Sequence, residues 1–297
     1  MEKMTDGLNL PISDRRFNAV QVIHIENETP IQTLGHSSKG NQLKWKVGNN
    51  WIKADGFGYE SLAEIVVSKM LGQTDIEEYV EYVPVKVRWQ DREYDGCMSE
   101  NFREEGWELV TVERLYRLMT GLSLAAQLAK FGEVQDRIAY MVDFVRNLTG
   151  LTGFGQYLAT MLELDAVFLN EDRHTNNIAF LYHSKKAEYR YCPYFDFGAG
   201  LYSDILGDYP LEKSVEECES LISAKPFSAD FDLQAEEARK LYPGGFHFSC
   251  SKNDLLKLWE GIKKEYESCS VRKEAHLITE RVDVALHRQF RKYAYLF

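Results

Sequence analysis

The sequence predicts a mixed α+β protein of two lobes, with a β-rich first part and a mainly helical second part. Three observations support this fold class. Residues 83–89 alternate strictly between apolar and polar side chains, which is the period of a half-buried strand. After about residue 105, apolar residues recur with the period of an amphipathic helix. A pair of short aromatic strands, residues 178–182 and 189–192, interrupts this helical half.

The first hundred residues are predicted to form strands around one helix. Residues 20–25 are a β-rich run, and residues 94–98 follow the alternating strand across a polar turn. A helix is expected over residues 60–71, with Gly72 as its stop, because the apolar side chains of this segment share one face. These side chains are Leu62, Ile65, Val66 and Met70.

Long helices are predicted for the second half. Residues 111–131, 134–148 and 153–169 are rich in apolar residues at helical spacing. Near the end, residues 251–254 fit a helix-starting box, and apolar residues of period 3.6 predict a last helix over residues 277–290. The second lobe is therefore expected to be helical apart from its one hairpin.

The length and composition fit a single bilobal unit. A chain of 297 residues can bury one large core or two modest ones, and its 44% hydrophobic and 27% charged residues exclude a disordered or fibrous chain. We place the first lobe in residues 1–101 and the second in residues 102–297.

Charge and cysteine content limit the partners and the compartment. A net charge of −11 argues against direct nucleic-acid binding, which needs a basic face. No segment approaches the roughly 18 apolar residues of a membrane span, and the first 17 residues lack a signal-peptide core. The five cysteines are scattered and include no CxxC pair. We therefore expect a cytoplasmic protein without a membrane partner.

The strongest chemical signal is a polar segment, residues 170–177, followed by the hairpin and then Asp196-Phe197-Gly198. Phosphoryl transfer needs one carboxylate at the attacking hydroxyl, plus oxygen ligands that hold Mg²⁺ against the phosphates. Asp172 and Asn177, spaced D-x-x-x-x-N, supply the carboxylate and one metal ligand from a single loop. Asp196 then arrives across the hairpin as the second metal ligand.

Each of these motifs alone has a simpler interpretation. The run Asp172-Arg173-His174 could be a turn with a solvated ion pair, and an isolated Asp-Phe-Gly triplet arises by chance in many proteins. The two motifs occur here in order and are separated by a predicted hairpin. Their combination favours a catalytic site.

Upstream residues fit the same chemistry. Lys53 ends an apolar strand-like segment, where a lysine can reach nucleotide phosphates. Glu60 opens the next helix and is predicted to hold this lysine in place, with Glu64, one turn later on the same face, as the alternative partner. The simpler interpretation makes Lys53 an ordinary surface lysine.

A small-residue loop precedes this strand, and its backbone N–H groups could cradle phosphates. Its sequence is not a Walker A motif. The phosphate-binding residues proposed in it are Gly35, Ser37, Ser38, Gly40, Gln42 and Lys44.

These motifs together resemble those of HipA-like serine/threonine kinases. Residues 40–44 are similar to the G-x-Q-x-K phosphate loop of that family, and Lys53 followed by Glu60 is similar to its strand lysine and helix acid. Residues 172–177 resemble the D-x-H-x-x-N catalytic loop, and residues 193–196 the P-x-Y-D metal segment. The resemblance covers about residues 35–200 and implies a bilobal protein-kinase-like fold.

The resemblance also implies cofactors and roles. ATP and Mg²⁺ would be bound, with Lys53 on the α- and β-phosphates and Asp172 as the catalytic base. Asn177 and Asp196 would hold Mg²⁺, and His174 would belong to the cofactor site. Adenine is expected near residues 97–101, which join the two lobes.

Partners and regulation are implied in the same way. The acceptor is expected to be a Ser/Thr hydroxyl of a protein, and a phosphate added to Ser37 or Ser38 would compete with ATP for the loop. Because about 30 residues precede the loop in this sequence, we expect the extra N-terminal subdomain of full-length family members to be lacking. A separately encoded small subunit could replace this part, and a separately encoded antitoxin-type protein is the partner that the resemblance implies. The Asp196-Phe197-Gly198 triplet is more similar to that of ordinary protein kinases.

Two alternative functions stay open at this point. A kinase-fold enzyme that phosphorylates a small molecule or a lipid head group would carry the same phosphate machinery. A non-catalytic nucleotide-binding module would act through protein contacts. The presence of Lys53, Asp172, Asn177 and Asp196 together argues against the second alternative, because such a module has no need of all four.

Overall fold

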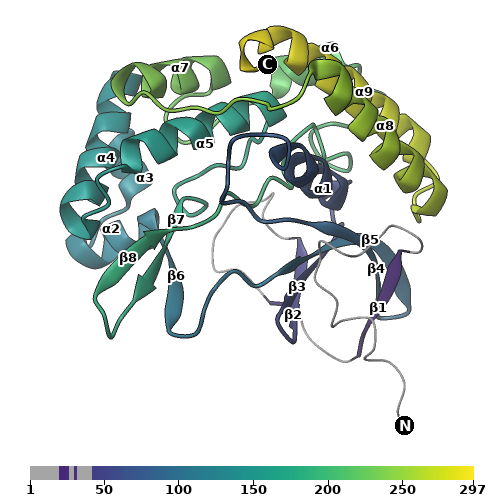
Figure 1. Ribbon diagram of the computed structural model, residues 1–297, viewed down its shortest axis with the longest axis horizontal. Helices are drawn as coiled ribbons and strands as arrows, with labels where there is room; N and C mark the ends of the chain where they lie inside the picture. Colours follow the sequence, from purple (N-terminus) through teal and green to yellow (C-terminus); the bar gives the residue numbers. More distant parts are fainter. Residues whose placement is uncertain (1–19, 27–29, 32–41) are drawn as a thin grey trace.

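The strands and the helices of the chain lie on opposite sides of the molecule. The computed structural model describes residues 20–26, 30–31 and 42–297. In Figure 1 the strands occupy the lower half and the helices form an arc above them, with α1 between the two. This arrangement matches the predicted order of a β-rich part followed by a helical part.

Five strands form the larger sheet, in the order β1-β4-β5-β3-β2. They are β1 (Gln21–Ile25), β2 (Leu43–Val47), β3 (Asn50–Ala54), β4 (Val83–Trp89) and β5 (Arg92–Glu100). β1 is parallel to β4, and the other neighbours are antiparallel. The alternation predicted for residues 83–89 is confirmed, since Val83, Val85 and Val87 are buried on one face of the sheet against Ile52.

Helix α1 (Glu60–Leu71) lies in the core rather than on the surface. All of its residues except Lys69 are buried, which is the pattern of a helix packed on every side. It contacts β5 on one side and α8 (Lys252–Cys269) on the other. Its bounds and its stop at Gly72 agree with the prediction.

A second, three-stranded sheet joins the two halves of the chain. It pairs β6 (Trp107–Thr111) with β7 (Ala179–His183), and β7 with β8 (Glu188–Tyr191). The β7–β8 hairpin was predicted from its aromatic pattern. β6 was not predicted, because its five residues lie directly before a helix and have no turn residue between.

The helix predicted over residues 111–131 is wrong in one respect. It is two helices, α2 (Val112–Thr120) and α3 (Leu124–Leu128). Gly121 ends α2 in the left-handed conformation, with φ of 75°, and the Ser123 side chain caps α3 by accepting from the backbone N–H of Ala126.

The remaining helices build the helical part around α5. They are α4 (Val134–Thr149), α5 (Phe154–Phe168), α6 (Val215–Leu221), α7 (Phe231–Leu241), α8 and α9 (Ala275–Lys292), followed by a 3₁₀ turn, Ala294–Leu296. All residues of α5 except Gln156 and Tyr157 are buried. The predicted helix start before α8 is confirmed, since Ser251 accepts from the backbone N–H of Asp254. α6 and α7 were not predicted.

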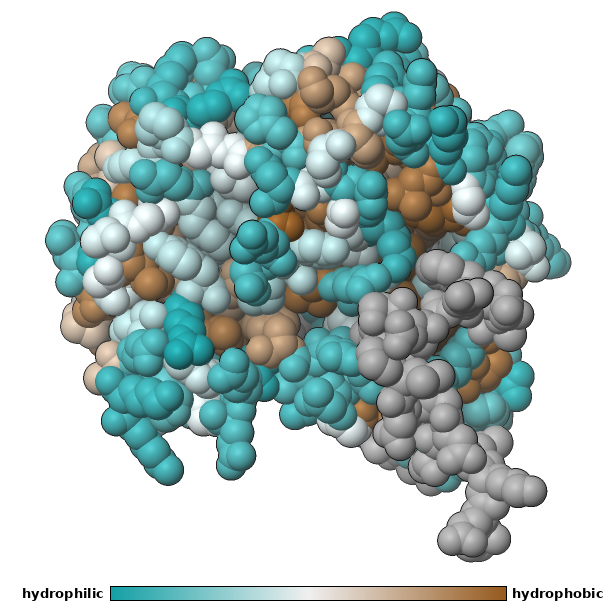
Figure 2. Space-filling view, in the orientation of Figure 1, coloured by the Kyte–Doolittle hydropathy of each residue, from teal (hydrophilic) through white to brown (hydrophobic). Residues whose placement is uncertain are grey.

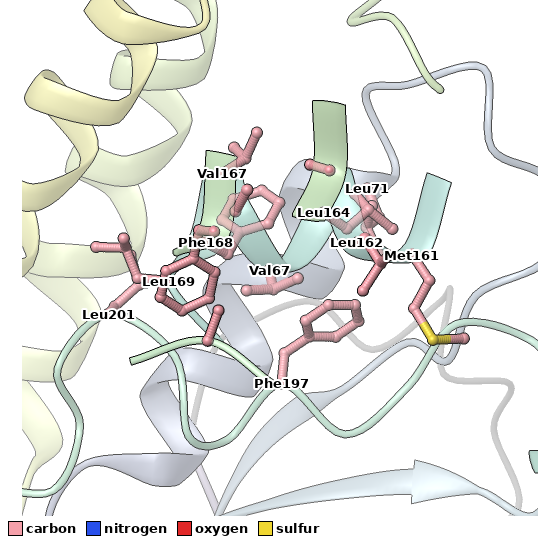
Figure 3. Packing of buried hydrophobic residues seen from close by; sticks show 14 of the residues in the cluster. Val67, Leu71, Met161, Leu162, Leu164, Val167, Phe168, Leu169, Phe197 and Leu201 are labelled. Carbon is pink, nitrogen blue, oxygen red and sulfur yellow. The ribbon is translucent and has the colours of Figure 1, made fainter. Parts of the chain in front are cut away.

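One hydrophobic core connects α1 to the helical part. Phe197, which follows Asp196, is 2% exposed and belongs to this core. Its ring points toward Val67 of α1 and Leu162 of α5 (Figure 3). The loop that carries Asp196 is therefore held by its buried neighbour.

The visible face of the molecule carries mostly hydrophilic side chains, with separate hydrophobic patches among them (Figure 2). Among the residues described by the structure, no helix has the length and the apolar composition needed to cross a bilayer.

Candidate active site

The predicted catalytic loop follows α5 directly. Leu169 ends that helix in the left-handed conformation, with φ of 56°, and the chain then turns through residues 170–177. The structure brings Asp172 and Asn177 together. The Asn177 Nδ2 donates to the Asp172 backbone oxygen at 2.7 Å and to Asp172 Oδ2 at 3.2 Å. The spacing D-x-x-x-x-N thus closes a compact loop that presents a carboxylate and an amide side by side.

Arg173 fixes this loop from inside the protein. It is 1% exposed, and its guanidinium binds the buried carboxylate of Asp165 on α5, with Nε 2.9 Å from Oδ2. The same side chain donates to the backbone oxygens of Asn177 and Phe195. Burial opposes the charge of Arg173, but the Asp165 carboxylate outweighs it and raises the pKa of the guanidinium. The interpretation as a solvated turn is therefore wrong.

The Asp196 carboxylate lies close to two lysines that come from neighbouring strands. The register of β2 and β3 places Lys44 opposite Lys53, so that both point to one face of the sheet. Asp196 Oδ1 lies 2.8 Å from Lys53 Nζ and 3.8 Å from Lys44 Nζ. Burial acts to raise the pKa of Asp196, but these two ammonium groups hold it well below its ordinary value. The carboxylate is therefore ionised, as a metal ligand must be.

The lysine partner predicted first, Glu60, is wrong, and the alternative, Glu64, is right. Lys53 Nζ donates to the Glu64 carboxylate in a short hydrogen bond, and Glu64 Oε2 also accepts from the backbone N–H of Phe197 at 2.9 Å. Burial acts to lower the pKa of Lys53, but Asp196 and Glu64 raise it well above its ordinary value. Glu64 thus links α1, the lysine strand and the loop of Asp196.

Glu60 instead closes the turn before α1. Its carboxylate accepts from the backbone N–H groups of Gly56, Phe57 and Gly58, at 3.3, 2.7 and 2.9 Å. Because the helix begins at this residue, the side chain folds back onto the backbone that precedes the helix. The Lys53 ammonium group bonds instead to Glu64, Tyr82 and Asp196. Glu60 still lines the pocket described below.

We predict that Glu64→Gln lowers the rate of any phosphoryl transfer by about 10²-fold, because Lys53 loses the charge that positions it. Glu60→Gln, the matched control one turn away, is expected to keep most of the rate and to lower the thermal stability instead. Steady-state rates and melting temperatures of both variants test this. The opposite ranking of the two rates would contradict the assignment of Glu64.

An open pocket of about 330 Å³ lies among the predicted site residues. Its lining residues are Gln42, Lys44, Glu60, Asp172, Asn177, Asp196, Gly198 and Ala199. Gln42 is 8% exposed, and its Nε2 has no hydrogen-bond partner within the described part of the chain. A buried donor without a partner is costly, and a ligand oxygen in the pocket would satisfy it.

Not every predicted site residue can be placed. Gly35, Ser37, Ser38 and Gly40 lie outside the described residues, and their assignment to a phosphate loop stays a prediction. His174 lies beside Asp172, with Nε2 3.8 Å from Asp172 Oδ1, and its Nδ1 is buried without a partner among the described residues.

The donor set fits Mg²⁺ held jointly with a ligand. The described residues contain no group of three or more His, Cys, Asp or Glu side chains that could hold a metal alone. Mg²⁺ typically takes one or two protein oxygens and completes its shell with phosphates and water. Asp196 supplies a carboxylate, and Asn177 donates through Nδ2, so that its Oδ1 is available as a second oxygen.

Three residues that support or contact the candidate site were not predicted from the sequence. Asp165 is an isolated acid within an apolar helix, and that contrast was the available signal. Tyr82, whose hydroxyl accepts from Lys53 Nζ at 3.2 Å, comes from the segment before β4. Lys225 lies between α6 and α7, with Nζ 3.6 Å from Asp172 Oδ1, and nothing in its local sequence indicates this position.

Comparisons with known proteins identify the fold of this chain. No family profile matches the chain, and no curated protein matches its sequence. The structure is similar to that of the Helicobacter pylori proinflammatory kinase CtkA, with a TM-score of 0.57 and 17% identity over 91% of this chain and 95% of CtkA. HipA of Shewanella oneidensis MR-1, solved with HipB and operator DNA, is matched at a TM-score of 0.37 and 12% identity over 90% of this chain and 66% of HipA. The predicted fold class is confirmed: the chain has a mixed α+β, kinase-like fold similar to that of CtkA.

Proposed function

We propose that this protein is an ATP- and Mg²⁺-dependent phosphotransferase of the HipA-like class that transfers the γ-phosphoryl group to a Ser/Thr hydroxyl of a protein. The observation that carries the proposal is the shared pocket of Asp172, Asn177 and Asp196, with Lys53 held between Glu64 and Asp196. A strand lysine paired with a helix glutamate is the arrangement that kinases need for transfer.

Each side chain then has a role that follows from its position. Asp172, in the catalytic loop, accepts the proton of the attacking hydroxyl. Lys53 and Lys44, which are paired across β3 and β2, bind phosphate oxygens, and Gln42 donates to a further oxygen. Asn177 and Asp196 would hold Mg²⁺, and the bound ion would supply positive charge against the phosphates.

The finer parts of the proposal are the acceptor, the partner and the compartment. A protein hydroxyl and an antitoxin-type protein partner follow from the motif resemblance described above, and the cytoplasm follows from the scattered cysteines and from the first 17 residues, which carry no signal-peptide core. All five cysteines are free thiols, and three of them are buried. Free thiols are typical of a reducing compartment.

A transfer assay with ATP labelled at the γ-phosphate tests the proposal. The wild-type protein is incubated with Mg²⁺ and with mixed proteins, small alcohols or lipid head groups as separate acceptors, and Asp172→Ala is the control. Label on protein hydroxyls in the wild type alone supports the proposal. Label on a small molecule alone would establish the other class of acceptor, and nucleotide binding without transfer to any acceptor or to water would establish a non-catalytic module.

A further inference from the structure

Lys225 reaches the candidate catalytic carboxylate from a distant part of the chain. It lies in the segment between α6 and α7, and its Nζ is 3.6 Å from Asp172 Oδ1. Its side chain is 44% exposed, whereas that of Asp172 is 7% exposed. The ammonium group therefore stands on the open side of Asp172.

The backbone around Lys225 is held firmly although the side chain is open to solvent. Gln234, fully buried on α7, donates to the Lys225 backbone oxygen at 3.0 Å. The buried Phe227 anchors the same segment, and its backbone oxygen accepts from Arg137 of α4 at 2.7 Å. A side chain on such a support is delivered to a defined place, as a catalytic group requires.

The distribution of charge around the pocket indicates what Lys225 does. Lys44 and Lys53 both lie on the Asp196 side, where they face the predicted metal and the inner phosphates. Lys225 lies on the Asp172 side, where the acceptor hydroxyl enters in the proposed function. A phosphoryl group that moves from one side to the other would pass from the first two lysines toward the third.

We propose that Lys225 is a catalytic residue that contacts the transferred phosphoryl group, an inference that rests on the proposed function. In that step the acceptor oxygen forms a bond to the γ-phosphorus, and the bond from this phosphorus to the β–γ bridging oxygen breaks. The bridging oxygen keeps the electron pair and leaves with ADP, while the hydroxyl proton passes to Asp172. Negative charge is spread over the three equatorial oxygens, and the Lys225 ammonium group stabilises it there.

The simpler alternative is an ordinary ion pair at the surface. An ion pair with one exposed partner adds little to stability, and under this alternative Lys225 would take no part in the reaction. Lys240 provides a control of similar exposure, because its side chain is 55% exposed and pairs with Glu236 at 2.8 Å and with Glu237 at 2.9 Å, all three on α7. It is not among the residues that line the pocket.

The test compares Lys225→Met, Lys225→Arg and Lys240→Met in the full-length chain with γ-labelled ATP and Mg²⁺. Lys225→Met is expected to lower kcat by about 10²–10³-fold, while the Kd for ADP, which lacks the γ-phosphate, and the melting temperature stay at wild-type values. Lys225→Arg should recover part of kcat, and Lys240→Met should match the wild type.

The outcomes separate this inference from the function on which it rests. An active wild type whose Lys225→Met variant keeps kcat within about threefold would overturn the role of Lys225 alone. Equal loss in the Met and Arg variants, with a lowered melting temperature, would assign Lys225 a structural role. A wild type that transfers no phosphate would overturn both proposals.

Discussion

Asp196→Ala is expected to abolish phosphoryl transfer and to weaken the binding of ATP with Mg²⁺ in the same variant. Asp196 is the carboxylate on which Lys44 and Lys53 converge, and its lowered pKa keeps it ionised for a metal. Its loss would remove a proposed metal ligand and would leave two neighbouring lysines without the charge between them. We expect kcat to fall by at least about 10³-fold, measured with labelled ATP, and the Kd for Mg²⁺-ATP to rise in a calorimetric titration.

Asp172→Ala is the matched variant on the other side of the pocket. It also should lose transfer, because no neighbour can replace Asp172 as the proposed base at the attacking hydroxyl. Mg²⁺-ATP binding, however, should remain close to that of the wild type, since Lys53, Asn177 and Asp196 are still present. Two variants that both turn over ATP within a few-fold of the wild type would contradict the site, and equal binding losses would contradict the division of roles.

Asp165→Ala is expected to lower the free energy of unfolding by about 3–5 kcal/mol, a larger loss than that expected for Glu60→Gln or Glu188→Ala. The substitution leaves the buried Arg173 guanidinium without its charged partner, in a place where water cannot reach it. Chemical denaturation monitored by circular dichroism measures the change. The helical core should be affected directly, because Asp165 lies on its central helix.

An exposed ion pair serves as the control for this second prediction. Arg190 and Glu188 on β8 form a pair at 3.1 Å with side chains 47% and 42% exposed. Glu188→Ala should change the free energy of unfolding by less than about 1 kcal/mol. If Asp165→Ala were as mild as Glu188→Ala, the Arg173 pair would not be what holds the catalytic loop.

Local patterns explain what could be predicted from the sequence. Alternation in residues 83–89 and helical spacing in residues 60–71 are signals within one element, and both elements form as expected. The pairing of Asp172 with Asn177 also depends only on one short loop. Asp196 was found because its distance from that loop along the chain matched a hairpin, so that one supersecondary unit defines most of the site.

The errors arise where a side chain or a strand depends on distant parts of the chain. Glu60 and Glu64 share a helix face, and the sequence cannot show that backbone N–H groups before the helix occupy Glu60. β6 forms because β7 offers it a partner more than sixty residues later. Lys225 reaches Asp172 through the packing of α7, for which no short motif exists.

A crystal structure with Mg²⁺ and a non-hydrolysable ATP analogue tests the central claim most directly, namely that this pocket holds the reacting phosphates. We expect the phosphates against Lys44 and Lys53, the metal on Asn177 and Asp196, and the γ-phosphate facing Asp172. Adenine should lie against residues 97–101, at the end of β5. A nucleotide bound elsewhere, or a metal that avoids Asp196, would contradict the account.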